Sequence, residues 1–293
     1  MSGLTFYLVD VFTQEKYAGN QLAVFTDTGD LPAEDMQKIA NEMHFSETTF
    51  IRSNEKRDGG YDVRIFTPNS EVPFAGHPTL GTAWVINHFI AGGKDGKVVL
   101  NLKVGQIIVI FKKEDDQETL WMKQASPVFG ESFTAGRLAK VLQLNESDFD
   151  ERIPVQEVST GLPFIIVALK TLDAAKRAAI SIGSLREMAS EVRGGILIFS
   201  PQTVDKRNDL HVRVFVDLLG IPEDPATGSG NGCLAGYLSR YHYFGTEVVN
   251  VRVEQGIELG RPSLLLLKAR KVGDDLQVEV GGQVFLVAKG QLA

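Results

Sequence analysis

Two stretches of this 293-residue chain repeat the same order of features about half a chain apart. One reads VRIFTPNSEVPFAGHPTLGTAW from Val63, and the other reads VRVFVDLLGIPEDPATGSGNGCLAGYL from Val212. Each predicts a strand starting Val-Arg, a loop with an acidic residue and a proline, and a glycine that opens a helix rich in small residues. A looser match pairs AGNQLAVF, from Ala18, with STGLPFIIVAL, from Ser159. Repeats in the same order indicate an internal duplication, and thus two similar domains facing each other across a cleft.

Strand patterns outnumber helical ones along the chain. Runs rich in β-branched and aromatic residues predict strands, as at 6–13 and 212–216. Helices are predicted at 77–90 and at about 229–241, each just after a glycine. Many strands with few helices are typical of an α+β fold with antiparallel or mixed sheets. The charged stretch KKEDDQE, at 112–118, indicates a hairpin turn and not a domain linker.

Composition excludes several classes of protein. The net charge of −7 argues against a nucleic-acid or anionic-membrane partner. Apolar runs such as Phe164–Leu169 are too short to span a bilayer, and the N-terminus lacks a signal-peptide pattern. The single cysteine, Cys233, cannot form an internal disulfide, which fits a cytoplasmic location. Zinc-ligand spacing, a P-loop and a strand-linked G-x-G-x-x-G motif are all missing, so we expect no metal and no organic cofactor.

The two helix-opening glycines predict a binding site for a small acid. Gly76-His77 opens one helix, and Gly228-Ser229 opens the other. Glycine lets the backbone approach a ligand, and the free N–H groups of a helix start attract anions. Two such starts aimed at one molecule would bind a carboxylate and stabilise an enolate-like charge. The alternative is that the glycines only allow tight turns and close packing of helix on sheet.

Four side chains near these features are candidate site residues. His77 stands at the expected helix cap, where a pKa near neutrality would suit a proton donor or ligand contact. Asp224 lies in the loop before the second helix, and Ser229 lies at that helix start. Plain structural roles remain open for all three: a polar surface or packing histidine, a turn carboxylate and an N-cap serine.

Glu47 begins a strand pattern although glutamate is depleted in strands. It is either a solvent-facing edge residue or a partly desolvated carboxyl with a raised pKa, suited to proton transfer.

Five stretches in the same order resemble one known family. They are DVFTQEKYAGN from Asp10, FSETTF from Phe45, RIFTPNSEVPFAGHPTLGTA from Arg64, EDPATGSGNG from Glu223 and EQGIELGRPS from Glu254. In these the chain resembles the PhzF-like family of phenazine-biosynthesis isomerases, which share the diaminopimelate epimerase fold. The resemblance covers nearly the whole chain.

The resemblance implies a domain organisation. It predicts two similar, pseudo-symmetric domains, each a mixed sheet wrapped around a central helix, with the active site in the cleft between them. The N-terminal domain would cover 1–126, joined by a returning C-terminal strand at about 282–293. The C-terminal domain would cover 127–281. The resemblance also implies a homodimer.

The resemblance also assigns roles to residues. The family's catalytic glutamate lies in S-E-[ST]-x-F, which is Glu47 here, and its substrate-site histidine lies in A-G-H-P, which is His77. Its site aspartate and serine lie in E-D-x-A-T-G-S, which are Asp224 and Ser229. The related epimerases and racemases carry a cysteine before each helix-opening glycine, where this chain has Ala75 and Thr227; Cys233 lies inside the second helix and replaces neither. Single-carboxyl acid/base chemistry is therefore expected in place of a two-thiol racemisation.

These observations predict a cofactor-independent isomerase acting on a small carboxylate-bearing metabolite. Glu47 would shuttle a proton between two carbons, while His77 and Asp224 position the substrate. The amides around Gly76, Gly228 and Ser229 would hold the carboxylate or the developing negative charge. Two alternatives stay open: a lyase or hydrolase on the same scaffold, which would have to work without a G-x-S-x-G elbow, and a non-catalytic protein that binds small acids.

Overall fold

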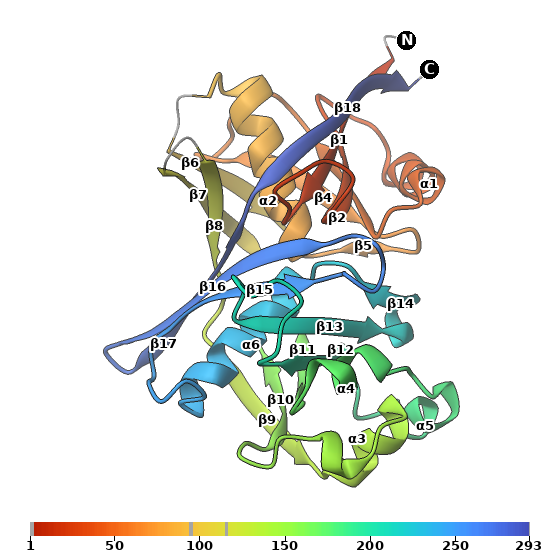
Figure 1. The fold of residues 1–293 in the computed structure, drawn as a ribbon. Helices are drawn as coiled ribbons and strands as arrows, with labels where there is room; N and C mark the ends of the chain where they lie inside the picture. Colours follow the sequence, from red (N-terminus) through yellow and green to blue (C-terminus); the bar gives the residue numbers. More distant parts are fainter. Residues whose placement is uncertain (1–2, 94–95, 115–116, 293) are drawn as a thin grey trace. The chain divides into compact units, whose positions relative to one another are not determined.

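A computed structural model describes residues 3–93, 96–114 and 117–292 (Figure 1). The chain divides into two compact units: unit 1 comprises residues 1–123 and 281–293, and unit 2 comprises residues 124–280. The sequence predicts divisions after residue 126 and near residue 282. The turn predicted within the charged stretch falls at 115–116, which lie outside the described residues, and a strand lies on either side of them.

Unit 1 contains one mixed sheet with two α-helices. Its strands are β1 (Leu4–Val11), β2 (Asn20–Phe25), β3 (Glu47–Ile51), β4 (Tyr61–Phe66), β5 (Glu71–Val72), β6 (Lys97–Leu102), β7 (Gly105–Glu114), β8 (Gln117–Lys123) and β18 (Val284–Leu292). Its helices are α1 (Ala33–Met43), α2 (Gly76–Val85) and a π-helical turn, Ile86–Ile90. The strand order is β18-β1-β2-β3-β4-β6-β7-β8, with β5 on β4. The pairs β2/β3 and β4/β6 are parallel and the others antiparallel. The C-terminal strand β18 therefore lies beside β1, as Figure 1 shows.

Unit 2 is built in the same way. Its strands are β9 (Val128–Phe133), β10 (Val155–Ser159), β11 (Pro163–Ala168), β12 (Gly195–Ser200), β13 (Leu210–Val216), β14 (Ile221–Asp224), β15 (Val249–Gln255) and β16 (Ser263–Val272), and β17 (Asp275–Gly282) runs past the division at 280. Its helices are α3 (Ala135–Leu142), α4 (Leu172–Arg177), α5 (Ile182–Glu187), α6 (Gly228–Arg240) and two 3₁₀ turns, Glu146–Asp148 and Asp217–Leu219. The strand order is β9-β10-β11-β12-β13-β15-β16, with β14 on β13.

The pairing directions repeat from one unit to the other. From β1 to β7 the successive pairs are antiparallel, parallel, antiparallel, parallel and antiparallel. From β10 to β16 the series is the same. The predicted α+β class with mixed sheets is confirmed.

One helix in each unit is buried on nearly all sides. Every residue of α2 except Trp84 is buried, and so is every residue of α6 except Ser229 and Arg240. A helix buried all round cannot be amphipathic, which explains why small and apolar residues occupy all faces of both. Close packing requires some of these glycines: a Cβ on Gly81 would lie 2.6 Å from Leu22 Cδ2 on β2. The packing interpretation of glycine therefore holds at Gly81, inside α2.

Other helices differ from the sequence-based expectation. The helix predicted at 77–90 is an α-helix only to Val85 and then widens into the π-helical turn. Helix α3 is not among the predicted helices, although its apolar residues Leu138, Val141 and Leu142 fall at helical spacing; they anchor it in the apolar core of unit 2. Among the helices of the described part of the chain, none has the length and apolar character needed to cross a membrane.

Candidate active site

The structure brings two of the predicted site residues together in unit 1. Parallel pairing of β2 with β3 places Glu47, the first residue of β3, opposite Leu22. Helix α2 contributes His77 from its first turn. The Nε2 atom of His77 lies 3.6 Å from Oε2 of Glu47 and 3.3 Å from the carbonyl oxygen of Gln21, on β2. A carboxyl and an imidazole from distant parts of the sequence are thus held side by side.

His77 is a neutral imidazole in this setting. Its side chain is 5% exposed, and burial lowers its pKa from 6.5 to about 3, against a weaker opposing effect of the hydrogen bond to Gln21. Because a carbonyl can only accept, the proton sits on Nε2 and is donated to Gln21, which leaves Nδ1 as an acceptor. The expectation of a near-neutral pKa is therefore wrong. So is the predicted cap position, since Ala75 is the N-cap and His77 is the second residue of α2.

The starts of α2 and α6 share their geometry and their chemistry. Their first turns read GHPT, from Gly76, and GSGN, from Gly228, and contain no acidic residue. The first N–H groups of a helix have no intrahelical acceptor, so each start presents donors and a partial positive charge. The N-cap of α6 is Thr227, so the alternative interpretation of Ser229 as an N-cap is wrong.

Asp224 ends strand β14 in unit 2 and is buried. Its Oδ2 accepts a hydrogen bond of 2.6 Å from the hydroxyl of Thr227, three residues later. Its backbone carbonyl accepts a second bond, of 2.7 Å, from Nε2 of Gln255 on β15. The carboxylate therefore has a local role in the loop before α6, which is the structural role that the Glu-Asp-Pro context suggested.

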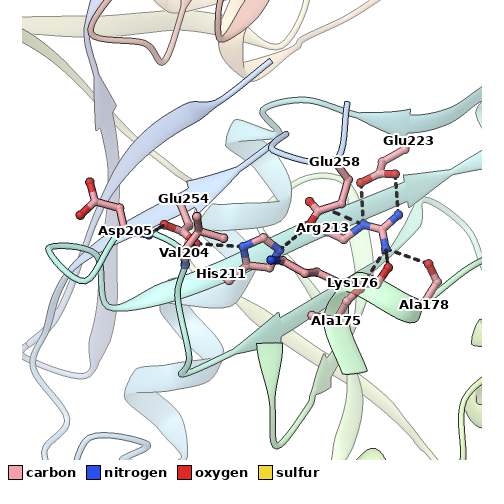
Figure 2. A network of polar contacts seen from close by, with 10 residues as sticks. All are labelled: Ala175, Lys176, Ala178, Val204, Asp205, His211, Arg213, Glu223, Glu254 and Glu258. Atoms are coloured by element: carbon pink, nitrogen blue, oxygen red, sulfur yellow. Dashed lines mark hydrogen bonds and ion pairs between the residues drawn. The ribbon is translucent and has the colours of Figure 1, made fainter. Parts of the chain in front are cut away.

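Each loop that leads to a buried helix is held by an arginine–glutamate pair that the sequence analysis missed. In unit 1, Arg64 on β4 donates two hydrogen bonds, of 2.8 and 2.7 Å, to Glu71 on β5. In unit 2, Arg213 on β13 donates bonds of 2.9 and 2.8 Å to Glu223 on β14 (Figure 2). Such two-point pairs fix direction as well as distance. A signal was present: both strands carry Val-Arg as their third and fourth residues, and both loops place a glutamate ahead of the helix-opening glycine.

Beside Arg213 lies a buried histidine that no motif in the sequence singled out. His211 lies between two carboxylates, with Nδ1 3.0 Å from Glu254 and Nε2 3.2 Å from Glu258 (Figure 2). Burial lowers the pKa of His211, but the hydrogen bonds and charges of Glu254 and Glu258 outweigh it, so its pKa is raised. Glu254 also accepts the backbone N–H groups of Val204 and Asp205. This network links strands β13 and β15 to the loop that precedes β13 within unit 2.

Cys233 is a buried packing residue of α6, as predicted. Burial raises the pKa of its thiol to about 11. The sulfur lies 3.6 Å from the hydroxyl of Thr160 and 3.5 Å from the carbonyl of Leu162. A thiol that stays protonated is a poor nucleophile and a poor base.

The remaining site predictions are located but not tested by these contacts. Glu47, Gly76 and His77 belong to unit 1, whereas Asp224, Gly228 and Ser229 belong to unit 2. Over residues 3–93, 96–114 and 117–292, three or more histidine, cysteine, aspartate or glutamate side chains do not gather in a way that could hold a metal ion. The expectation that the protein works without metal or cofactor stays a prediction.

Comparison with known proteins decides the family. A family model described as "Phenazine biosynthesis-like protein" matches residues 9–290. The chain belongs to the phenazine biosynthesis-like family. It is 32% identical to the trans-2,3-dihydro-3-hydroxyanthranilate isomerase of Pseudomonas fluorescens, over 98% of each chain.

Solved structures of this family agree with the fold. The crystal structure of a PhzF-family phenazine biosynthesis protein from Bacillus anthracis matches with a TM-score of 0.90 and 26% identity, over 100% of both chains. A probable proline racemase from Agrobacterium radiobacter, 12% identical, matches with a TM-score of 0.60 over 99% of this chain and 93% of its own, which shows a shared fold alone. The resemblance seen in the sequence is confirmed, and this phenazine biosynthesis-like protein is an isomerase.

Proposed function

We propose that this isomerase moves a proton between two carbon atoms of a small carboxylate-bearing substrate, and that Glu47 carries the proton. The observation behind the proposal is the pair formed by Glu47 and His77, whose facing atoms are 3.6 Å apart. The side chain of Glu47 is 18% exposed, so it is partly shielded from water and still open to a ligand. A relative of similar length is named trans-2,3-dihydro-3-hydroxyanthranilate isomerase, so trans-2,3-dihydro-3-hydroxyanthranilate is the first substrate to test.

In this mechanism a carboxylate acts first as base and then as acid. Glu47 removes a proton from one carbon of the substrate and returns it to another. A neutral His77 suits this role, because an imidazolium beside Glu47 would stabilise the carboxylate and weaken it as a base. The imidazole accepts a hydrogen bond at Nδ1, where a hydroxyl or amino group of the substrate can donate.

The helix starts supply the anion-binding groups. The amides at Gly76, Gly228 and Ser229 hold the substrate carboxylate or the negative charge that develops when the carbon loses its proton. Asp224 takes part in the same reaction by binding a polar group of the substrate. The repeated pairing directions and the two buried helices support an origin of units 1 and 2 by duplication, each with its sheet around a central helix. We also propose that the enzyme works in the cytoplasm without a cofactor and, as the resemblance implies, as a homodimer.

Glu47→Gln tests the proposal. The amide keeps the size of the side chain but cannot exchange a proton, so turnover should fall by at least about 10²-fold while KM changes little. The measurement is incorporation of deuterium from heavy water into trans-2,3-dihydro-3-hydroxyanthranilate and its product. Glu42→Gln, five residues earlier on the exposed side of α1, is the matched control and should behave as wild type.

Two outcomes would contradict this assignment. Equal rates for wild type and Glu47→Gln would remove Glu47 from the reaction. Absence of both product formation and deuterium exchange in the wild type would exclude this substrate. Glu47→Asp adds a geometric check, because the shorter side chain withdraws the carboxyl and should also slow turnover.

A further inference from the structure

We infer that Gln255 is a positioning residue of the enzyme, which holds Asp224 and the start of α6 in place for the reaction. The inference rests on the proposed role of Asp224. Gln255 is the last residue of β15, and its side chain is completely buried. A buried amide loses its hydration, so it is stable only where protein groups satisfy both of its ends.

Every hydrogen bond of the Gln255 side chain goes to the segment that begins with Asp224. Its Nε2 donates to the carbonyl of Asp224, at 2.7 Å, and to the hydroxyl oxygen of Thr227, at 3.1 Å. Its Oε1 accepts the backbone N–H of Thr227, at 3.2 Å, and Nδ2 of Asn231, at 2.8 Å. One side chain thus joins the end of β14, the N-cap of α6 and the first turn of α6.

These bonds also set the direction of the Thr227 hydroxyl. A hydroxyl has a single proton to donate. Because Gln255 donates to the oxygen of Thr227, the O–H proton is free to point at Oδ2 of Asp224, which lies 2.6 Å away. The chain from Gln255 through Thr227 to Asp224 therefore orients the carboxylate as well as its backbone.

The next residue shows how closely β15 approaches this loop. Gly256 has a φ of +74°, and a Cβ there would lie 2.5 Å from the carbonyl oxygen of Pro225 and 2.4 Å from that of Arg261. Such contacts would force the backbones apart. The glycine thus lets the end of β15 meet the loop, and Gln255 completes the contact with hydrogen bonds.

Unit 1 shows that the sheet forms without such an amide. Leu100 is the first residue of β6 that pairs with β4, and Val253 is the first residue of β15 that pairs with β13. Two residues further along these strands stand Leu102 and Gln255. The side chain of a leucine cannot hydrogen-bond, yet β4 and β6 still pair in parallel, over one residue pair fewer than β13 and β15, and unit 1 keeps its own buried helix. The sheet therefore does not require the glutamine. Its role lies instead in holding the loop before α6.

Gln255→Leu, which copies the residue of unit 1, tests the inference. Without the amide, the carboxylate of Asp224 should shift. A shift of about 1 Å in a positioned group should lower kcat for trans-2,3-dihydro-3-hydroxyanthranilate by about 10²-fold. Thr227→Val, which removes only the hydroxyl, should give a smaller loss in the same direction. Gln124→Leu is the matched control, because Gln124 is another buried glutamine of unit 2 and accepts a hydrogen bond from Thr160.

A double-mutant cycle separates positioning from general destabilisation. If Gln255 acts through Asp224 and the start of α6, Gln255→Leu should cost less activity in the Asp224→Ala background than in the wild type, so the two losses do not add. If the losses multiply, Gln255 acts elsewhere and the inference is wrong. Should Gln255→Leu fail to fold, the same cycle with Thr227→Val decides, because the hydroxyl is part of the same chain of bonds.

Failure of the proposed function is recognised separately. If the wild type does not turn over the substrate, this substrate is excluded, and if Asp224→Ala is fully active, the proposed role of Asp224 is wrong. Amide hydrogen exchange over residues 225–231 then tests Gln255 by itself. Exchange there should rise about tenfold or more in Gln255→Leu and stay unchanged in Gln124→Leu. Equal exchange in the two variants would overturn the inference.

Discussion

In each unit an arginine–glutamate pair holds the loop before a buried helix, but the two pairs are buried to different depths. The Arg64–Glu71 pair of unit 1 has side chains 27% and 15% exposed, and Lys103 also reaches Glu71. The Arg213–Glu223 pair of unit 2 has side chains 9% and 10% exposed. Arg213 donates further bonds to the carbonyls of Ala175 and Ala178 (Figure 2). The Arg213–Glu223 pair is thus part of the core of unit 2.

The same comparison shows that Glu47, the proposed proton carrier, has no counterpart in unit 2. The first pair of β2 with β3 is Leu22 with Glu47, and the first pair of β11 with β12 is Phe164 with Gly195. The position that carries a carboxyl in unit 1 is therefore a glycine in unit 2. The two sheets have the same strand pairing but different side chains at this position. The sheet alone therefore does not determine the chemistry.

The largest expected contrast is between the two arginines. Arg213→Met should lower the free energy of unfolding by about 3–5 kcal/mol, because it leaves Glu223 buried without its partner. Arg64→Met should cost only about 1 kcal/mol, because water reaches this partly exposed pair and Lys103 still pairs with Glu71. Both tryptophans, Trp84 and Trp121, lie in unit 1, so their fluorescence follows its unfolding, and circular dichroism follows both units. Equal losses would show that depth of burial does not separate the two pairs.

The two buried histidines should give the units opposite responses to pH. The pKa of His77 is lowered, so the unfolded chain binds a proton below pH 6.5 that the folded unit 1 does not. Unit 1 should lose about 1.4 kcal/mol for each pH unit between 6.5 and about 3 from this group. The pKa of His211 is raised, so its contribution is complete below pH 6.5 and is lost as the pH rises through the folded value.

Denaturation curves at a series of pH values measure this difference. His77→Gln should flatten the acid side for unit 1, as followed by tryptophan fluorescence. His211→Gln should flatten the alkaline side for unit 2. Burial raises the pKa values of Glu254 and Glu258, but contacts led by those to His211 outweigh it and lower both. These carboxylates add an acid loss to unit 2, which His211→Gln should reduce as well. An unchanged alkaline slope in His211→Gln would contradict the assignment to this histidine.

The smallest effect is expected at the lone cysteine. Cys233→Ala should cost about 1 kcal/mol of stability, through a small cavity in α6, and leave kcat/KM within about twofold of wild type. A native-state thiol assay should find the sulfur unreactive, because its pKa is raised to about 11. A large loss of turnover at unchanged stability would instead favour a thiol mechanism like that of the related epimerases.

Local sequence reasoning found the residues at the ends of elements. Glu47 stood out as a glutamate at a strand start, and the two glycine-led helices followed from their loops. Gln255 did not stand out, because its partners lie 24 to 31 residues away and become neighbours only when β15 pairs with β13. Arg213 and Glu223 were visible in the repeat, but their hydrogen bonds depend on the turn from β13 to β14.

The sequence by itself determined the family, the α+β class, the two helix starts and the absence of cysteines before them, since these depend on residue types and their local order. The tertiary structure decided the protonation of the histidines and the contacts of the carboxylates. A pKa depends on solvent exclusion and on charges a few ångströms away, and neither is set by neighbours in the sequence. The packing of α2 thus makes His77 neutral beside Glu47, whereas Glu254 and Glu258 favour a proton on His211.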